Sequence, residues 1–387
     1  MSLGESLWVE PIRDTANSVA TPRQSPSKQA EKLITPRPGT NVELPFIGRK
    51  IELEAVKRYN TGQMYLPLFV FGPEGCGKSR LFKEAVKRFK EWYPDGVAVL
   101  VDTRKSELAE AVIATAPVDV KKLAKQLAKA MFRSLSQITH FGEFFAIMAT
   151  SIPKYVKTKD VKRIFIVVDE VTTTFVNVEA YAKSMESTMN VGRPEELKDV
   201  IVNFFALTSE GYSRGLLARH SYVWQAYLWN LPRRDFEELY YRARELYPGP
   251  APPFDEVWKL YGGNPRGLEE LAKLGWDVDK YKRRLAALKG LESLVGLVKG
   301  RRLGELARRV VEDVDYLRLG EEPELHELAD LLIRYNLVME LPRDLELGNE
   351  VDTPFEPPPI DRELGVGKHY AWQVPIYREL FAKALAE

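Results

Sequence analysis

The sequence predicts an α/β protein in which a parallel, doubly wound sheet has helices on both faces and is followed by an all-helical unit and a winged helix. Two observations lead to this prediction. Between Pro67 and Leu231, short continuous apolar runs alternate with segments of helical periodicity, which is typical of parallel strands joined by helical crossovers. After Pro232 helical segments take over, and two short apolar runs near the C-terminus stand on either side of a proline-rich stretch.

The first part of the chain is predicted to supply the whole sheet. The apolar runs are short and rich in Val, Ile and Phe, which favours buried strands over helices. We expect strands at residues 67–71, 97–102, 163–169, 200–208 and 222–231. Helical spacing predicts helices at residues 51–56, 81–92 and 118–136, with a further helix reaching residue 149.

The second part is predicted to be mainly helical. Helical spacing appears at residues 235–247, 254–261, 267–274, 303–314 and 324–336, and a closing helix is expected at 376–386. Strand-like runs at 337–341 and 370–374 with a long loop between them are typical of the hairpin of a winged helix. We therefore divide the chain into an extended or disordered arm (1–44), an α/β domain (45–231), a helical domain (232–298) and a winged-helix-like domain (299–387).

Composition excludes several classes of protein. The chain has 387 residues, 45% of them hydrophobic, which suits a globular protein of two or three domains. No apolar run reaches the roughly 18 residues that span a bilayer, and Ser2 to Asp14 has no signal-peptide pattern, so we expect a cytoplasmic protein without a membrane partner. One cysteine and four histidines without ligand spacing exclude a disulfide framework and a cysteine metal cage.

A glycine-rich loop carries the strongest functional signal. Residues Gly72 to Ser79 read GPEGCGKS and match G-x-x-x-x-G-K-[ST], the Walker A pattern, between a predicted buried strand and a predicted helix. In such a loop successive N–H groups and the helix N-terminus bind phosphates, the lysine neutralises them and the hydroxyl ligates Mg²⁺. The loop predicts a site for ATP or ADP and Mg²⁺ made of Pro73, Glu74, Gly75, Cys76, Gly77, Lys78, Ser79 and Arg80. Cys76 occupies a free position of the pattern, where we expect it to act as filler.

Two acids end the strand predicted at residues 163–169. Asp169 can complete the Mg²⁺ shell beside Ser79, and Glu170 is then placed to polarise the water that attacks the γ-phosphate. A strand that ends in solvated acids is the alternative. The adjacent pair favours an ATPase over a small-metabolite kinase, which has less need of a water-activating glutamate.

Residues after the next predicted strand are candidates for sensing the γ-phosphate. Thr208 or Ser209 can hydrogen-bond the phosphate or the attacking water, although an ordinary turn at the strand end is an open alternative. Arg214 or Arg219 can act as an arginine finger, within the chain or across a subunit contact, or can be a solvated loop arginine. We include Lys78, Glu170, Ser209 and Arg214 in the catalytic set.

Taken together, these motifs resemble the archaeal ATPase family within the STAND branch of AAA+-like P-loop proteins. The resemblance rests on Phe46-Ile47-Gly48-Arg49 with Glu52, the glycine-rich loop, Asp169-Glu170 and Tyr261-Gly262-Gly263-Asn264-Pro265-Arg266, and it covers roughly residues 44–387. It implies an ATPase domain, a helical lid and a winged helix. It also implies that Ile47 and Gly48 line the base pocket and that Arg49 belongs to the nucleotide site. Pro265 is expected to pack near the base or ribose, and Arg266 to point at the phosphates. Thr208-Ser209-Glu210-Gly211 departs from the Gly-Ser pair frequent in the family, and Val171 to Phe175 lacks its Phe-Gln continuation.

The resemblance implies a switch in which ATP closes the lid and the winged helix reports closure to a protein or DNA partner. A DNA-binding ATPase similar to archaeal replication initiators is an alternative, supported by the basic run from Tyr281 to Val310. An acidic run follows from Glu312 to Asp330, so the two blocks can instead pair within the protein. A scaffold that binds nucleotide without hydrolysing it is a third possibility, which the intact Lys78, Ser79, Asp169 and Glu170 disfavour.

Overall fold

A computed structural model describes residues 43–102, 112–115, 161–170, 198–208, 224–318, 322–341 and 357–387. These residues belong to one compact unit, Asn41–Glu387. The predicted N-terminal arm therefore lies outside the described residues except for its last two, of which Leu44 is buried. The helix predicted at 118–136 also lies outside them.

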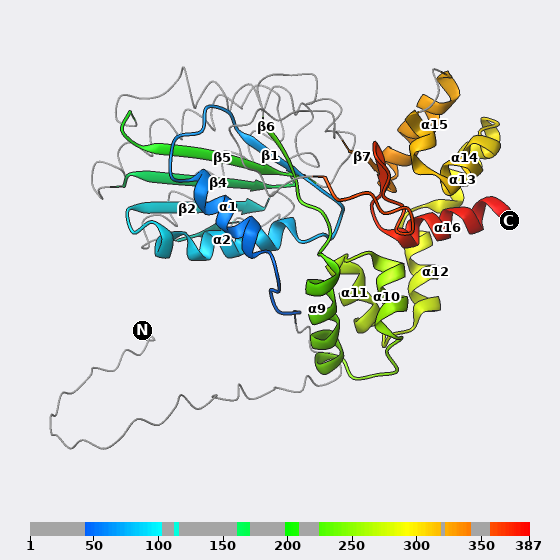
Figure 1. Ribbon diagram of the computed structural model, residues 1–387, viewed down its shortest axis with the longest axis horizontal. Helices are drawn as coiled ribbons and strands as arrows, with labels where there is room; N and C mark the ends of the chain where they lie inside the picture. Colours follow the sequence, from blue (N-terminus) through cyan, green and yellow to red (C-terminus); the bar gives the residue numbers. More distant parts are fainter. Residues whose placement is uncertain are drawn as a thin grey trace, which may run out of the picture. The chain divides into compact units, whose positions relative to one another are not determined.

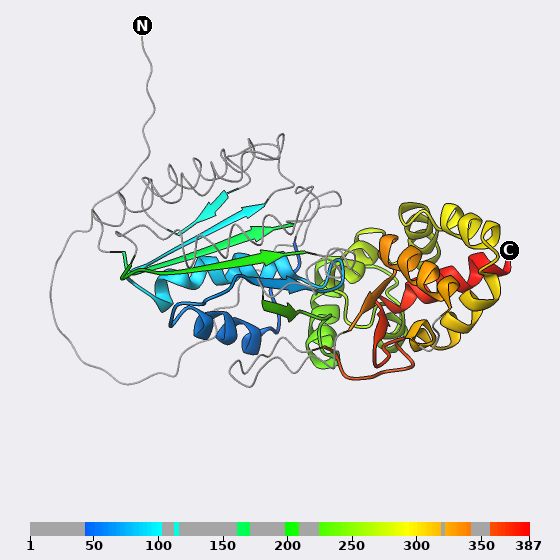
Figure 2. The same cartoon turned by 90° about the horizontal axis from the view of Figure 1, so that it is seen from above.

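The sheet is six-stranded, with the order β3-β2-β4-β5-β1-β6 (Figure 2). Its strands are β1 (Leu68–Phe71), β2 (Gly96–Asp102), β3 (Val112–Ala114), β4 (Arg163–Asp169), β5 (Ile201–Leu207) and β6 (Trp224–Tyr227). Every neighbouring pair is parallel except β2 and β3, which are antiparallel. The predicted α/β class is confirmed, and among the described strands of this sheet β3 is the one that the sequence did not indicate.

Two helices cover one face of this sheet, α1 (Lys50–Tyr59) and α2 (Lys78–Trp92) (Figure 1). Aromatic side chains form the contact. Phe89 of α2 stacks on Phe165 of β4 with ring centroids 5.2 Å apart, and Phe82 lies 5.5 Å from Phe205 of β5. Phe165 and Phe205 meet edge to face at 5.0 Å. Aromatic pairs of this kind add about 0.5–1.5 kcal/mol each to the free energy of burial, so α2 is firmly attached to the strands beneath it.

Helices dominate the remainder of the described chain (Figure 1). They are α9 (Arg233–Leu246), α10 (Phe254–Tyr261), α11 (Pro265–Lys273), α12 (Val278–Leu288), α13 (Leu291–Gly300), α14 (Gly304–Glu312), the 3₁₀ helix η2 (Val314–Arg318), α15 (Pro323–Arg334) and α16 (Pro375–Ala386). A two-stranded antiparallel sheet of β7 (Val338–Glu340) and β8 (Tyr370–Trp372) precedes α16, as expected for a helical region followed by a hairpin. Among the described residues, no helix combines the length and apolar character that crossing a bilayer requires.

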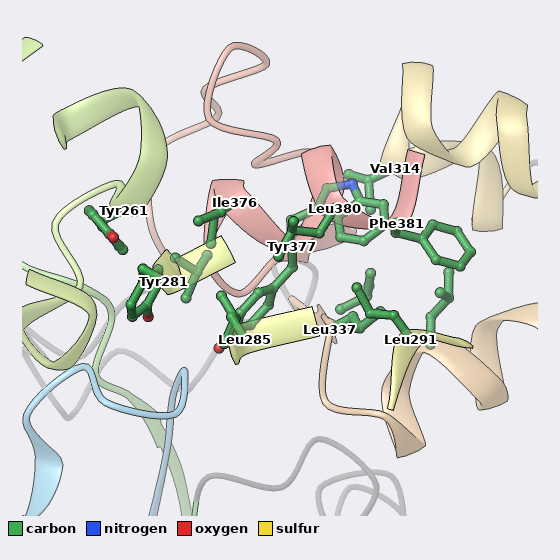
Figure 3. Close-up of a cluster of buried hydrophobic side chains, with 14 of the residues drawn as sticks. Tyr261, Tyr281, Leu285, Leu291, Val314, Leu337, Ile376, Tyr377, Leu380 and Phe381 are labelled. Atoms are coloured by element: carbon green, nitrogen blue, oxygen red, sulfur yellow. The ribbon is translucent and has the colours of Figure 1, made fainter. Parts of the chain in front are cut away.

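One buried cluster joins these helices across the predicted boundary at residues 298 and 299. Tyr281 and Leu285 of α12, Leu291 of α13 and Leu380 and Phe381 of α16 all belong to it (Figure 3). Each fully buried Leu or Phe contributes about 1.5–3 kcal/mol relative to an exposed one. The helices before residue 298 and the C-terminal segment therefore share a core, and moving one against the other would expose this apolar surface.

Asp315 in η2 anchors the hairpin. Its carboxylate accepts N–H bonds from Lys368, His369 and Tyr370 at 2.6, 2.8 and 3.1 Å, and Arg362 lies 3.0 Å away. Burial acts to raise the pKa of Asp315, but the main-chain donors and Arg362 outweigh it and hold that pKa below its ordinary value. The folded state therefore favours the ionised carboxylate.

Asp315→Ala is expected to lower the free energy of unfolding by about 2 kcal/mol, because it leaves charge-assisted N–H donors without their acceptor. A carboxyl with a depressed folded pKa stabilises above its unfolded pKa, so this contribution should be fully present at neutral pH and should decline as the pH falls from about 4 through the lower folded pKa. Denaturant unfolding at pH 7 and pH 3 measures both effects. Asp330→Ala, at an exposed position of α15, is the control; equal stability of the two variants at pH 7 would contradict the anchoring role.

Candidate functional site

The glycine-rich loop (Gly72–Ser79) lies between the fully buried strand β1 and helix α2, as predicted. Gly75 and Gly77 have φ angles of 80° and 102°, a region that side chains with a Cβ rarely adopt. A Cβ on Gly72 would lie 1.9 Å from the Leu228 carbonyl oxygen, and one on Gly75 would lie 2.5 Å from Cβ of Arg266. The glycines are thus required both by the curvature of the loop and by the segments packed against it.

Helix α2 begins at the end of this loop without a side-chain cap. Gly77 is its N-cap, and glycine has no side chain that could accept a hydrogen bond from the first turn. The first N–H groups of a helix have no partner within the helix, and the helix dipole favours negative charge there. The loop and the start of α2 therefore present an anion-binding arrangement of main-chain donors.

Lys78 lies buried at the base of the loop. Its Nζ donates to the carbonyl oxygens of Gly72 and Pro73 at 2.8 and 3.0 Å. The ammonium group is therefore held beside the main chain that would surround a phosphate. Cys76 is buried and its Sγ lies 3.2 Å from the Leu228 carbonyl oxygen, so it joins the loop to the end of β6, which agrees with a packing role.

Acidic residues end a strand at the same edge of the sheet. Val70 of β1 is in register with Leu207 of β5, and Leu207 is in register with Asp169 of β4. The carboxyl ends of parallel strands share one edge, so the glycine-rich loop and Asp169 lie on the same edge with the end of β5 between them. Asp169 is fully buried.

Glu170 has an unusual main-chain conformation. Its φ angle is 57°, in the left-handed region that few residues other than glycine adopt, and its side chain is buried. Such a conformation costs of order 1–3 kcal/mol and is found most often at functional sites. This strain is an independent reason to place Glu170 in the candidate site.

Among the predicted sensing residues, only Thr208 can be located. It is fully buried, and its N–H donates to the Val70 carbonyl oxygen at 3.2 Å, which places it between β1 and β4. Ser209, Arg214 and Arg219 lie outside the described residues, as does Val171 to Phe175, so their roles stay predictions.

Arg49 has a structural contact that the sequence did not indicate. Its guanidinium donates to Glu52 at 2.7 Å, to the Cys76 carbonyl oxygen at 2.9 Å and to the Trp229 carbonyl oxygen at 2.5 Å. It therefore ties the start of α1 to the glycine-rich loop and to the chain after β6.

Ile47 packs beside the helical core, and a Cβ on Gly48 would lie 2.3 Å from the Asp235 carboxylate of α9.

The predicted lid element also contacts the glycine-rich loop. Asn264 caps α11 by accepting the Gly267 N–H at 3.0 Å, and Pro265 is the first residue of that helix. Arg266 lies 2.7 Å from Glu74 in a salt bridge, and its N–H donates to the Gly75 carbonyl oxygen at 3.3 Å. Arg80 points elsewhere, because its guanidinium donates to the Leu44 carbonyl oxygen.

Ser79 and Asp169 provide a donor set that fits Mg²⁺. Both are oxygen donors, which Mg²⁺ prefers, and Mg²⁺ is held in most nucleotide sites by one or two protein oxygens together with phosphate. The described part of the chain holds no cluster of three or more His, Cys, Asp or Glu residues placed to bind a metal ion. Two oxygen donors suit a cation that is shared with a bound phosphate.

Several residues around the loop were not predicted. Four of them lie outside the motifs and belong to the hydrogen-bond and ion-pair contacts around the loop: Asn230, Lys289, Asn336 and Gln373. Asn264 belongs to a motif, but no role was predicted for it. No local pattern marks the first four, because their role depends on contacts between distant parts of the chain. Buried polar side chains such as Asn230 and Gln373 become conspicuous only when burial is known.

Comparisons with known proteins agree with the motifs. The model of a family described as "ATPase domain predominantly from Archaea" matches residues 46–271. No curated protein matches the chain.

Solved structures of low sequence identity are also similar to the chain. The Aeropyrum pernix ORC2 protein is 14% identical, with a TM-score of 0.43 over 89% of this chain and 96% of that one. The Aeropyrum pernix ORC1 protein, solved in complex with DNA, is 14% identical, with a TM-score of 0.42 over 89% and 93%. Domain III of the Thermotoga maritima replication initiation protein DnaA is 14% identical, with a TM-score of 0.31 over 59% and 82%.

Proposed function

Because the chain belongs to the family of ATPase domains found predominantly in Archaea, we propose that it is a Mg²⁺-dependent ATP-hydrolysing switch with slow turnover. The observation that supports this proposal most is the shared sheet edge. The glycine-rich loop with Lys78 follows β1, and the acidic pair Asp169-Glu170 lies at the end of β4, at the same edge of the sheet and separated only by the end of β5. A site of this composition suits a triphosphate and an attacking water, whereas phosphate binding alone needs no buried, strained glutamate.

Each residue has a definite task in this proposal. The N–H groups from Gly75 to Ser79 bind phosphate oxygens, and Lys78 exchanges its main-chain carbonyl partners for the β- and γ-phosphates. Mg²⁺, when bound, neutralises the charge on those phosphates. Ser79 and Asp169 hold the cation, and Glu170 orients and deprotonates the water. Thr208 or Ser209 contacts the γ-phosphate, and Arg214 supplies the finger.

The base side of the site is proposed from the other motifs. Ile47 and Gly48 line the base pocket and Pro265 packs near the ribose. Arg49 acts through the glycine-rich loop, since its guanidinium bonds the Cys76 carbonyl oxygen. Arg266 reaches the phosphates only after leaving Glu74, to which it is 2.7 Å away.

The switch follows from the division into domains. We assign the ATPase domain to 45–231, the lid to 232–298 and a winged helix of the STAND type to 299–387. The lid residues Asn264 and Arg266 contact Glu74 directly. Phosphate binding at the glycine-rich loop would therefore alter the contacts of Glu74 that also hold the lid residues Asn264 and Arg266. A resulting movement of the lid is transmitted to the C-terminal segment through the apolar core that the two share.

Salt bridges within the chain weaken the support that the basic run from Tyr281 to Val310 gives to a DNA partner. Several of its cations pair with carboxylates within the chain, as in Lys282–Glu379, Lys289–Glu74, Arg301–Glu327 and Arg308–Glu305. The exposed pairs among them contribute little to stability, but all four reduce the positive field available to DNA phosphates. Of these pairs, Arg301–Glu327 joins the basic run to the acidic run, and the other three involve carboxylates outside the acidic run.

Phosphate release from ATP is expected to require Mg²⁺ and to fall to background in excess EDTA, because Ser79 and Asp169 hold the cation only together with phosphate. Hydrogen exchange in the same samples should show Asn264 to Gly267 more protected with a non-hydrolysable ATP analogue than with ADP. Hydrolysis unaffected by EDTA would exclude the proposed metal role. Hydrolysis with identical exchange in both nucleotide states would exclude the switch and leave a plain ATPase.

A further inference from the structure

Glu74, at the tip of the glycine-rich loop, is held by residues from three other parts of the chain. Its carboxylate contacts Arg266 of α11 at 2.7 Å, Lys289 after α12 at 3.0 Å and Asn336 after α15 at 3.5 Å. Burial acts to raise the pKa of Glu74, but Lys289 and Arg266 outweigh it and hold that pKa below its ordinary value. A carboxylate thus stands within a loop built to bind anions, with two cations facing it.

The main chain of Glu74 is held as well. Its N–H donates to Oε1 of Gln373 at 3.1 Å, and its carbonyl oxygen accepts from Nδ2 of Asn264 at 2.9 Å. Gln373 is fully buried and lies 299 positions away in the sequence. A hydrogen bond between these groups therefore depends on the complete tertiary structure.

Side-chain amides close a ring around this contact. Asn230 donates to the Gln373 carbonyl oxygen at 2.9 Å and accepts from Asn264 at 2.9 Å. Nε2 of Gln373 donates to Oδ1 of Asn336 at 2.6 Å, and Asn336 reaches back to Glu74. Buried polar networks in which every member is bonded hold one geometry, and loss of a member leaves others unsatisfied. The ring therefore specifies where the tip of the loop lies.

The charges have a direct consequence for nucleotide. A triphosphate brought into the loop approaches the Glu74 carboxylate, and like charges a few ångströms apart repel. Two cations offset this repulsion, but to different extents. The Lys289 side chain is 11% exposed and the Arg266 side chain is 45% exposed. Water therefore screens the charge of the Arg266 guanidinium more strongly than that of the Lys289 ammonium. Lys289 is thus the main compensating charge, and it lies outside the segment matched by the family model.

We propose that Lys289 and Gln373 are positioning residues for the glycine-rich loop, so that the chain beyond the matched ATPase domain completes the nucleotide site. Lys289 neutralises Glu74, and Gln373 holds the Glu74 main chain. This inference rests on the proposed function, because it assumes that the loop binds ATP. Thermodynamic linkage makes this effect reciprocal: if the hydrogen-bonded ring strengthens nucleotide binding, bound nucleotide stabilises the ring by the same free energy. Nucleotide binding is thereby coupled to the C-terminal segment that supplies Gln373.

The test is a set of variants of the full chain titrated with methylanthraniloyl-ATP and Mg²⁺. Lys289→Met is expected to raise Kd about fivefold. The double variant Lys289→Met/Glu74→Gln is expected to bring Kd back to within about twofold of the wild-type value. Residues in contact deviate from additivity by free energies of this size. Gln373→Met should also raise Kd about fivefold, and Glu74→Gln should not rescue it, since that contact is to the main chain. Thermal melting of the same variants separates binding from folding, and the Lys289–Glu74 pair tests the proposal even if Gln373→Met does not fold.

Lys273→Met is the matched control, because Lys273 lies on α11 in an exposed salt bridge with Glu269. A Kd for Lys289→Met equal to that of Lys273→Met would overturn the inference, as would tighter binding by Lys289→Met or no rescue by Glu74→Gln. Wild-type protein that binds no nucleotide would overturn the proposed function together with the inference. Wild-type binding with unaltered Lys289→Met binding would overturn the inference alone.

Discussion

Lys78→Ala is expected to weaken ATP binding and to lower turnover by about 100-fold or more, because a buried charged donor aimed at phosphate is among the largest single terms in such a site. The Lys78 ammonium donates to the Gly72 and Pro73 carbonyl oxygens at 2.8 and 3.0 Å. Alanine removes the cation and also leaves those carbonyls without this donor. Isothermal titration with ATP and a steady-state phosphate-release assay measure the two effects.

Lys87→Ala is the control for this variant, since Lys87 lies on the same helix α2 at an exposed position. It should bind and hydrolyse ATP as the wild type does. Turnover by Lys78→Ala within twofold of the control would contradict the assignment of the glycine-rich loop as the phosphate site.

Glu170→Gln is expected to lower turnover by about 10²- to 10⁴-fold while ATP binding changes little, because glutamine keeps the shape but removes the base. Glu170 follows β4 in the left-handed region, and glutamine is as strained there as glutamate, so the substitution should not relieve the main chain. Single-turnover hydrolysis and a binding titration on one preparation separate the chemical step from binding.

Glu91→Gln provides the matched control at an exposed position of α2. Hydrolysis by Glu170→Gln at the control rate would show that another group activates the water. Absence of hydrolysis by both proteins would instead favour the scaffold interpretation. Loss of binding by Glu170→Gln would instead mean that the residue holds the nucleotide or the cation.

Local periodicity was enough to predict the elements that place the site. The strand predicted at 163–169 has the bounds of β4, and the helix predicted at 254–261 has those of α10. Both have strong patterns, a continuous apolar run for β4 and a narrow apolar stripe for α10. The loop between β1 and α2 was placed correctly because its glycines, lysine and flanking strand are all local signals.

The sequence was less informative where stability comes from distant contacts. Strand β3 has three residues and pairs antiparallel at the edge of the sheet, too short a run for alternation to be visible. Helices α12 and α13 were not predicted. The cations from Tyr281 to Val310 were interpreted as a basic surface, whereas the buried apolar residues of both helices belong to the core shared with α16. Charge along a sequence does not tell which face of a helix is buried.

The same limit applies to the site. Arg49 belongs to a recognisable box, yet its bond to the Cys76 carbonyl oxygen depends on how α1 packs. Gln373 has no motif and lies in the hairpin before α16, so its bond to Glu74 was beyond any local argument. Residues that touch phosphate follow a spacing rule, whereas residues that position the loop follow only from the tertiary fold.

A structure of the wild-type protein with Mg²⁺ and a non-hydrolysable ATP analogue tests the central claim most directly. The account predicts phosphate density against the N–H groups of Gly75 to Ser79, Lys78 Nζ moved from the Gly72 and Pro73 carbonyls to the phosphates, and a cation between Ser79 and Asp169. Density for the nucleotide at any other place, with Lys78 still bonded to those carbonyls, would contradict it.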